Sequence, residues 1–227
     1  MGSAIIILTA LLAISEALSL IPQVRSNGVF QVIYNLLKIL AGKGKGIRAM
    51  DSFEYAFVKT LGAEGGYSDD PFDKGGETNW GITKAVFEDA LRRGIISGTS
   101  DIRFLTIAQA RAIYKIDYWF PIKLDMVLNQ EIAAEIFDTA VNMGRSRAIK
   151  IVQESLNFLG EKLDVDGIIG KLTLIAIQKW INKDVRALFV CLNGFQFMKY
   201  IDIIRNDSSQ IRFSRGWTKR VQGYKEG

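Results

Sequence analysis

The most constraining feature of the sequence is the run from Glu64 to Thr83, which cannot form ordinary hydrophobic core. It holds five acidic residues, five glycines and one proline, residue types that favour turns over regular helix or strand. Before it, Asp51 to Leu61 places apolar residues at helical spacing, and Gly62 and Gly65 then end the helix. The run therefore predicts a site built on turns.

Glu64 lies at or just beyond the predicted helix C-terminus, where the helix dipole disfavours an anion and favours a protonated carboxyl. A carboxyl that stays protonated near neutral pH is what a general acid requires. The next part, Tyr67 to Ile82, predicts a short irregular hairpin that folds Asp73 back towards Glu64. One protonated and one ionised carboxyl facing each other are the usual equipment for cleaving a glycosidic bond.

The order Glu64, Asp73, Thr78 resembles the catalytic Glu, Asp and Thr of phage-type lysozymes. The segment EGGYSDDPFDKGGETNWGIT more closely resembles glycoside hydrolase family 108. Members of this family are N-acetylmuramidases of phage lysis and of bacterial secretion loci. The resemblance implies that Glu64 protonates the leaving oxygen and that Asp73 activates water or stabilises the oxocarbenium-like state. Thr78 would then help to position the water.

Other interpretations of the same run remain open. Acidic, glycine-rich loops also bind calcium, but Asp69, Asp70 and Asp73 do not alternate as calcium ligands do. A solvated turn without chemistry is a further alternative. Within the hairpin, Asp69, Asp70 and Glu77 compete with Asp73 as the partner of Glu64.

The amino-acid composition excludes several kinds of catalytic and metal site. The chain has 227 residues, a formal charge of +5 and no histidine, which excludes catalytic triads and zinc sites that use imidazole. The single Cys191 lies in an apolar run and is interpreted as packed. We expect no cofactor and no metal. The basic balance suits an anionic partner such as a cell wall, nucleic acid or lipid headgroups.

The N-terminal residues predict a membrane anchor. Ala4 to Ile21 is almost entirely apolar and close to the minimum length of a bilayer span. A cleaved signal peptide is the rival interpretation, although a positively charged segment before the apolar run is missing. Val29 to Ala41 predicts an interfacial amphipathic helix, and residues 42–46 a basic Gly-Lys linker. Because basic residues only follow the span, the positive-inside rule predicts a cytoplasmic catalytic domain, which conflicts with a cell-wall substrate.

Helices are expected on both sides of an aromatic segment. Lys84 to Arg93 is predicted to be helical with Thr83 as N-cap, and residues 106–118 are predicted to be helical with Thr106 as cap. Tyr118 and Trp119 then form either core or a sugar-stacking wall. A similar Tyr-Trp segment recurs beside the cleft in family 108, so the resemblance implies that Tyr118 and Trp119 bind substrate. Tyr67 and Trp80 in the hairpin are further expected substrate-binding residues.

Gln130 to Val141 is predicted to be a strongly buried helix, and it places Asp138 and Asn142 on one face. The segment FDTAVNMG resembles the family, in which case Asn142 would reach an N-acetyl group of the substrate. The alternative is that Asp138 and Asn142 form a buried structural hydrogen-bond pair.

The C-terminal third predicts helices at 148–159, 171–180 and 184–204, with a glycine-rich turn at 164–170. The segment DVDGIIGKLTLIAI resembles the turn of a peptidoglycan-binding module found at the C-terminus of family 108 proteins. Basic and aromatic residues alternate in the tail, a pattern that suits either nucleic-acid binding or docking on a lysozyme-like core. We expect docking and no nucleic-acid partner.

The sequence therefore predicts a mainly α protein with a lysozyme-like α+β domain and a small β-hairpin at the active site. Residues 1–49 form the anchor with its N-terminal transmembrane helix, 50–145 the catalytic region, and 146–227 a peptidoglycan-binding-like helical region packed on it. The expected reaction is hydrolysis between N-acetylmuramic acid and N-acetylglucosamine in bacterial peptidoglycan, by a phage or membrane-containing virus. A non-catalytic wall-binding protein and a structural virion membrane protein are the alternatives.

Overall fold

The computed structural model describes residues 52–61, 66–69 and 76–221. The chain divides into two units, Met1–Met50 and Asp51–Gly227, and all described residues belong to the second. The predicted anchor at 4–21, the amphipathic helix at 29–41 and the basic linker lie outside the described residues. The membrane-span prediction therefore stays a prediction.

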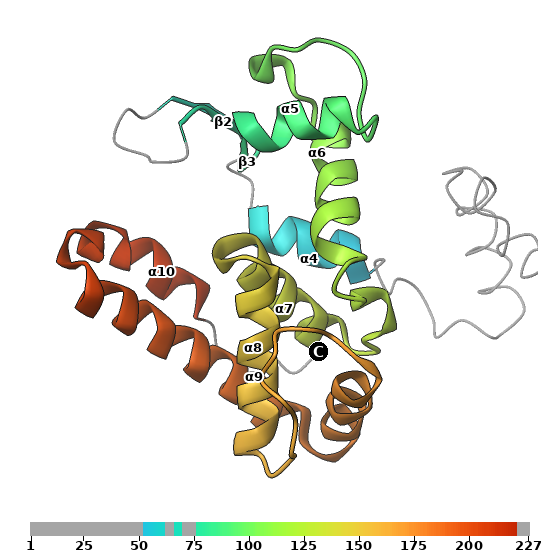
Figure 1. Cartoon of the computed structure of the whole chain (residues 1–227), viewed down its shortest axis with the longest axis vertical. Helices are drawn as coiled ribbons and strands as arrows, with labels where there is room; N and C mark the ends of the chain where they lie inside the picture. Colours follow the sequence, from blue (N-terminus) through green and yellow to red (C-terminus); the bar gives the residue numbers. More distant parts are fainter. Residues whose placement is uncertain (1–51, 62–65, 70–75, 222–227) are drawn as a thin grey trace, which may run out of the picture. The chain divides into compact units, whose positions relative to one another are not determined.

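The described elements are mostly helical, with one small sheet (Figure 1). The α-helices and strands are α4 (Ser52–Leu61), β1 (Tyr67–Ser68), β2 (Thr78–Asn79), β3 (Ile82–Thr83), α5 (Lys84–Arg92), α6 (Ile107–Tyr114), α7 (Gln130–Met143), α8 (Arg145–Phe158), α9 (Lys171–Asn206) and α10 (Ser214–Arg220). Short 3-10 helices occur at Ile102–Phe104, Leu124–Met126 and Ser208–Phe213, and a π-helix at Lys115–Trp119. A mainly helical protein with a small sheet beside its helices is consistent with the predicted lysozyme-like class.

The sheet is an antiparallel meander in the order β1-β2-β3. Thr78 lies opposite Ser68 on one side and opposite Thr83 on the other, so β2 is the central strand. Buried Asn79 donates from Nδ2 to the carbonyl oxygens of Ile102, at 2.9 Å, and Arg103, at 3.2 Å. These bonds tie the sheet to the loop that precedes α6. The sequence predicted the hairpin, and the structure adds β3 as a third strand.

Five aromatic side chains form the centre of the core where α4, α6 and α7 meet. Phe53, Phe57, Tyr114, Trp119 and Phe137 are each at most 2% exposed. The ring of Phe137 lies edge-on to those of Phe53, Trp119 and Tyr114, with centroids 5.8 to 6.0 Å apart. Edge-to-face contacts of this kind add to the burial of large apolar rings. They fix α4 on α7, the helix against which most of the domain packs.

The two helix starts predicted from capping residues are confirmed. The Oγ1 of Thr83 accepts from the amide of Val86 at the start of α5. Thr106 and Gln109 form a reciprocal capping box at the start of α6. Such caps satisfy amides that lack a partner in the first helical turn, which is why Thr at these places signals a helix start.

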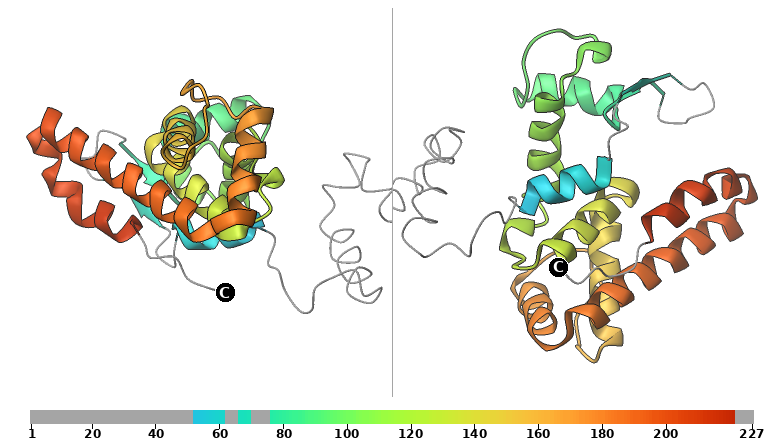
Figure 2. Two further views of the ribbon diagram at one scale, coloured as in Figure 1. Left: turned by 90° about the horizontal axis from the view of Figure 1, so that it is seen from below. Right: turned by 180° about the vertical axis from the view of Figure 1, so that it is seen from behind.

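Helix α9 joins two segments that the sequence separates. Asp184 has non-helical dihedral angles of φ −162° and ψ 86° inside it, and its Oδ1 accepts from the amide of Ala187. Among the described helices, α9 alone is long and apolar enough to cross a membrane. It is kinked, however, and packs on α7 and α8 as core helices do. The 3-10 helix Ser208–Phe213 and α10 then return along its second half (Figure 2).

Helix α7 also carries a stripe of four polar residues, Glu131, Glu135, Asp138 and Asn142. Their spacing of four, three and four residues places them on one face of the helix. Glu135 is only 2% exposed, and its Oε1 has no hydrogen-bond partner among the described residues. Buried carboxyls of this kind need partners from the surrounding elements.

The partners of the stripe come from three different helices. Tyr55 and Lys59 of α4 bind Glu131, Asn193 of α9 bonds Glu135, Arg220 of α10 pairs with Asp138, and Tyr200 of α9 donates to Asn142. Asp138 and Asn142 therefore bond different partners and not each other. The predicted docking of the C-terminal segment on the catalytic region runs along this stripe.

The stripe predicts an unusual dependence of stability on pH. Burial raises the pKa of Glu135 to about 8, and the neighbouring Asp138 adds to the rise, while Lys59 and Asn193 oppose it. Burial raises the pKa of Asp138 as well, against the effect of Arg220. Because the folded-state pKa of Glu135 lies above its ordinary value of 4.5, its stabilising contribution is complete at low pH and is lost as pH rises through about 8.

We therefore expect the melting temperature to fall between about pH 5 and about pH 9, and Glu135→Gln to reduce that fall by a few degrees. Calorimetry across this range measures it, with Glu88→Gln on the exposed face of α5 as the control. Equal pH profiles for the wild type and Glu135→Gln would contradict the assignment.

Candidate active site

Of the three predicted catalytic residues, the structure describes only Thr78. Glu64 and Asp73 are outside the described residues, so their roles stay predictions. Thr78 is half-buried on the central strand β2, held between Ser68 and Thr83 by the sheet register. The sheet thus gives Thr78 a fixed backbone position within the predicted catalytic segment.

Glu77, an alternative partner for Glu64, is engaged by two other side chains. Its Oε2 accepts from Nζ of Lys84 at 2.6 Å, and its Oε1 accepts from the hydroxyl of Tyr67 at 2.8 Å. The bond to Lys84 lowers the pKa of Glu77, and that to Tyr67 acts in the same direction. Glu77 is therefore ionised, as the partner of a general acid must be, but both of its carboxylate oxygens are already bonded to Lys84 and Tyr67.

Tyr67 is exposed on β1 and keeps a free ring face while its hydroxyl bonds Glu77. That hydrogen bond raises the pKa of Tyr67 to about 12, so the phenol stays neutral. Its contact with a sugar stays a prediction.

Trp80 has a structural role in the fold. It takes the turn between β2 and β3 with a positive φ of 52°, and its Nε1 donates to the carbonyl of Leu105 at 3.1 Å. The hydroxyl of Tyr114 in turn donates to the Trp80 carbonyl at 3.1 Å. A Cβ added at the next residue, Gly81, would lie 2.8 Å from that hydroxyl, so the close approach requires glycine. Trp80 therefore clamps the sheet on α6.

The π-helix separates the two neighbouring aromatics of the Tyr-Trp segment. Trp119 is 2% exposed and packs against Phe53 and Phe137, which leaves it no surface for a sugar. For Trp119 the structure thus favours the core interpretation. Tyr118 is only partly buried and lines a pocket. π-helical turns often occur at functional sites, since they rotate successive side chains off the α-helical pattern.

Asn142 is partly exposed, and its Oδ1 accepts from the hydroxyl of Tyr200 on α9 at 2.9 Å. Its contact with an N-acetyl group stays a prediction. The alternative paired Asn142 with Asp138, but the structure bonds Asn142 to Tyr200 and Asp138 to Arg220.

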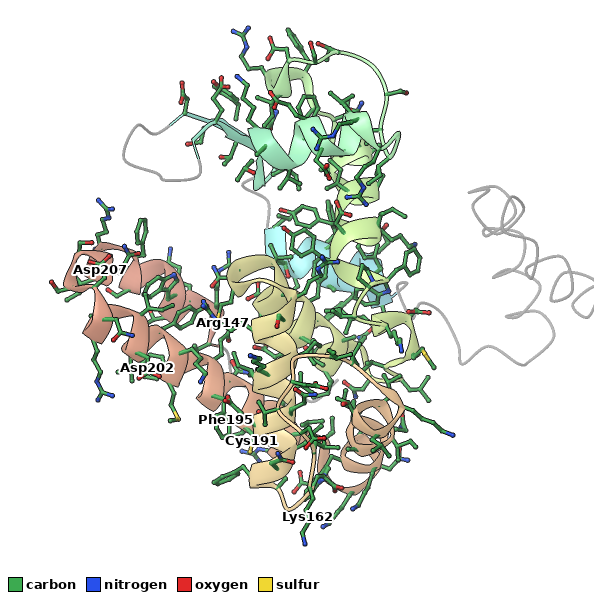
Figure 3. The ribbon with its side chains drawn as sticks, in the orientation of Figure 1. Arg147, Lys162, Cys191, Phe195, Asp202 and Asp207 are labelled. Atoms are coloured by element: carbon green, nitrogen blue, oxygen red, sulfur yellow. The ribbon has the colours of Figure 1, made fainter. Side chains whose placement is uncertain are left out.

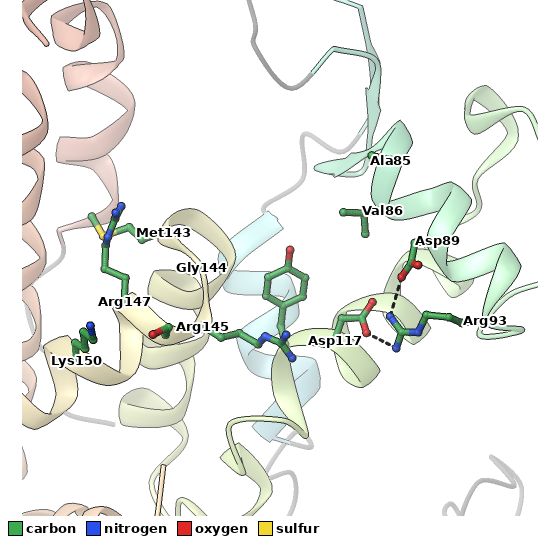
Figure 4. Close-up of a pocket in the computed structure, with 12 residues that line it drawn as sticks. Ala85, Val86, Asp89, Arg93, Asp117, Met143, Gly144, Arg145, Arg147 and Lys150 are labelled. Atoms are coloured by element: carbon green, nitrogen blue, oxygen red, sulfur yellow. Dashed lines mark hydrogen bonds and ion pairs between the residues drawn. The ribbon is translucent and has the colours of Figure 1, made fainter. Parts of the chain in front are cut away.

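A pocket of about 850 Å³ opens between the start of α5, the π-helix and the junction of α7 with α8 (Figure 4). It is lined by Ala85, Val86, Asp89, Arg93, Asp117, Tyr118, Met143, Gly144, Arg145, Ser146, Arg147 and Lys150. Of the predicted site residues, only Tyr118 belongs to this lining. The described residues hold no group of three or more His, Cys, Asp or Glu side chains placed to bind a metal ion.

The two walls of the pocket differ in charge. On the α5 and π-helix wall, Arg93 bridges Asp89 at 3.0 Å and Asp117 at 2.8 Å. The bonds from Arg93 and Arg92 hold the pKa of Asp89 below its usual range. The opposite wall carries Arg145, Arg147 and Lys150 on α8. The sequence analysis missed these three cations, although the basic run that follows Gly144 was a visible signal.

Two family matches divide the described part of the chain. Residues 57–144 match the family Glycosyl hydrolase 108, and residues 147–222 match the family Predicted Peptidoglycan domain. The chain carries a glycosyl hydrolase 108 domain. The peptidoglycan domain follows it directly, and together the two matches support a glycoside hydrolase that acts on peptidoglycan.

The structure of Brucella abortus SagA is similar to this chain. The two chains share 29% sequence identity with a TM-score of 0.59, over 75% of this chain and 89% of that chain. No curated protein matches the sequence.

The pocket lies at the boundary between the two matched segments. Its α5 and π-helix wall belongs to the glycosyl hydrolase 108 domain, whereas Arg147 and Lys150 belong to the predicted peptidoglycan domain. Both segments therefore contribute side chains to one cavity.

Proposed function

We propose that the protein hydrolyses the bond between N-acetylmuramic acid and N-acetylglucosamine in bacterial peptidoglycan. The observation that carries the proposal is the glycosyl hydrolase 108 match over residues 57–144, which spans Glu64, Asp73 and Thr78 together. The peptidoglycan domain that follows supports the choice of polymer.

In this proposal Glu64 is the general acid that protonates the leaving oxygen, and Asp73 activates water or stabilises the oxocarbenium-like state. Thr78 helps to position the water, and its place on the central strand of the sheet supports this role. The pairing of Glu77 with Lys84 supports Asp73 over Glu77 as the second carboxylate.

The size and lining of the pocket suit a carbohydrate polymer. Its volume of about 850 Å³ is at the upper end of small-ligand sites, which leaves room for more than one sugar. Tyr118 supplies an aromatic side chain, and the charged residues supply hydrogen-bond donors and acceptors for hydroxyl and acetamido groups. Tyr67 offers a second exposed ring on the adjacent sheet.

The proposal includes a membrane anchor formed by residues 4–21, supported by their apolar composition. The anchor would hold the hydrolase near the cell wall, on the periplasmic side or in the membrane of a virus particle, for host wall lysis or penetration. An anchored protein should stay with membranes during carbonate extraction. A mature chain that begins near Ser19 or Leu20 would instead show a cleaved signal.

The catalytic assignment predicts that Glu64→Gln lowers the clearing of purified wall suspensions by a factor of about 10² to 10⁴, the usual contribution of a general acid. The melting temperature should stay within a few degrees, because the substitution keeps the shape of the side chain. Turbidity decrease and calorimetry measure the two effects.

Glu77→Gln is the matched control, since it changes the same chemical group in the same segment. Its carboxylate is already paired with Lys84 and Tyr67, so we expect activity within about threefold of the wild type. Full lysis by Glu64→Gln, or a loss with Glu77→Gln as large as that with Glu64→Gln, would overturn the assignment.

A further inference from the structure

The α8 wall of the pocket presents three cations outside the described ion pairs, although the charge of Lys150 also acts on the carboxylate of Asp166. None of the ion pairs found among the described residues involves Arg145, Arg147 or Lys150. All three side chains are exposed at the pocket surface. The two carboxylates on the facing wall, Asp89 and Asp117, are balanced by two other cations, because Arg93 pairs with both and Arg92 pairs with Asp89 as well.

The three cations cover different parts of the wall. Arg145 is the first residue of α8, and Figure 4 shows its side chain extending towards Asp117 on the opposite wall. Its charge also reaches Tyr118, whose burial-raised pKa it lowers. Arg147 and Lys150 are three residues apart and share one face of the helix. From residue 145 to residue 150 the helix rises roughly 7.5 Å.

The backbone adds positive potential at the same place. Gly144 separates α7 from α8 with a φ of 87°, and no side chain caps the start of α8. The first amides of this helix of 14 residues thus have no side-chain partner, and the dipole favours an anion there. The pocket therefore combines cationic side chains that form no described ion pair with a favourable helix end.

The glycan strand of peptidoglycan cannot explain this charge by itself, because its acetamido and hydroxyl groups are neutral. The anionic groups of peptidoglycan freed of teichoic acid are the carboxylates of the peptide stem attached to muramic acid, and these are spaced along a flexible chain. Cations spread over more than one helical turn suit such separated carboxylates better than one compact phosphate.

We propose that Arg145, Arg147 and Lys150 form a subsite for the free carboxylates of the peptide stem, so that the enzyme recognises peptide-bearing glycan. This inference rests on the proposed function and deepens it. It also gives the predicted peptidoglycan domain a concrete role, since Arg147 and Lys150 come from that segment. The stem would lie along α8 while the glycan contacts the wall of α5 and Tyr118.

The test compares two forms of purified peptidoglycan freed of teichoic acid. In both forms the amino groups are acetylated, and in one the carboxylates are then coupled to glycinamide, which neutralises them and keeps the glycan. Binding is measured by sedimentation with Glu64→Gln as the parent protein, so that hydrolysis does not interfere. We expect the parent to bind the neutralised form about tenfold more weakly, and salt to weaken binding of the charged form alone.

The triple variant Arg145→Gln, Arg147→Gln, Lys150→Gln in the same parent should bind both forms equally, at the weaker level. A matched control replaces Lys162, Lys171 and Arg186 by Gln, which removes the same charge from exposed sites of the C-terminal segment outside the pocket. Figure 3 shows Lys162 well away from Arg147. The control should keep the preference for charged peptidoglycan.

Equal binding of both forms by the parent would overturn the subsite, and so would a pocket variant that still prefers the charged form. A pocket variant that loses binding only on walls that retain teichoic acid would overturn it as well, because the cations would then bind phosphate. Digestion of both forms by the wild type distinguishes a failure of the subsite proposal from a failure of the proposed hydrolase function. Cleavage of neither form refutes the hydrolase, whereas equally efficient binding and cleavage of both refutes the subsite alone.

Discussion

The fold depends on the polar stripe of α7, because the partners that its side chains have lie on other helices. Glu131 needs α4, Glu135 and Asn142 need α9, and Asp138 needs α10. Removing one partner would leave a carboxyl or amide without its bond in the interior, which is costlier than losing an exposed pair. The stripe therefore specifies how the C-terminal helices are placed on the catalytic region.

This constraint reaches the pocket through the end of α7. The helix stops at Met143, Gly144 turns the chain, and α8 starts with the basic residues of the pocket wall. The aromatic cluster around Phe137 fixes the opposite wall, because the π-helix that buries Trp119 also presents Tyr118 and Asp117 to the pocket. The two family segments thus form one structural body, with a cavity at their boundary.

Much of this arrangement could be predicted from local sequence. Thr83 and Thr106 marked helix starts, and Asp184 marked the break inside α9, because capping is decided by neighbouring residues. The turn-rich segment also predicted a small sheet. The resemblance to family 108 was carried by that same segment, and the family match includes it.

The remainder depended on contacts between distant residues. Neighbouring Tyr118 and Trp119 have different environments, since Trp119 packs in the core and Tyr118 lines the pocket, and composition does not reveal which of the two is buried. The predicted contact of Trp80 with substrate stays a prediction, whereas its hydrogen bonds to Leu105 and Tyr114 join residues far apart in the sequence. Asp138 finds its partner, Arg220, 82 positions away. The basic pocket wall likewise appears only when α8 faces α5.

The central claim is that this chain hydrolyses the bond between N-acetylmuramic acid and N-acetylglucosamine in peptidoglycan, with one general acid and one carboxylate that activates water. Mass spectrometry of the fragments released from purified peptidoglycan tests it most directly. The account predicts soluble fragments that carry N-acetylmuramic acid at the reducing end, with one water added for each bond broken. Fragments ending in anhydro-muramic acid, fragments with N-acetylglucosamine at the reducing end, or the absence of released fragments would contradict it.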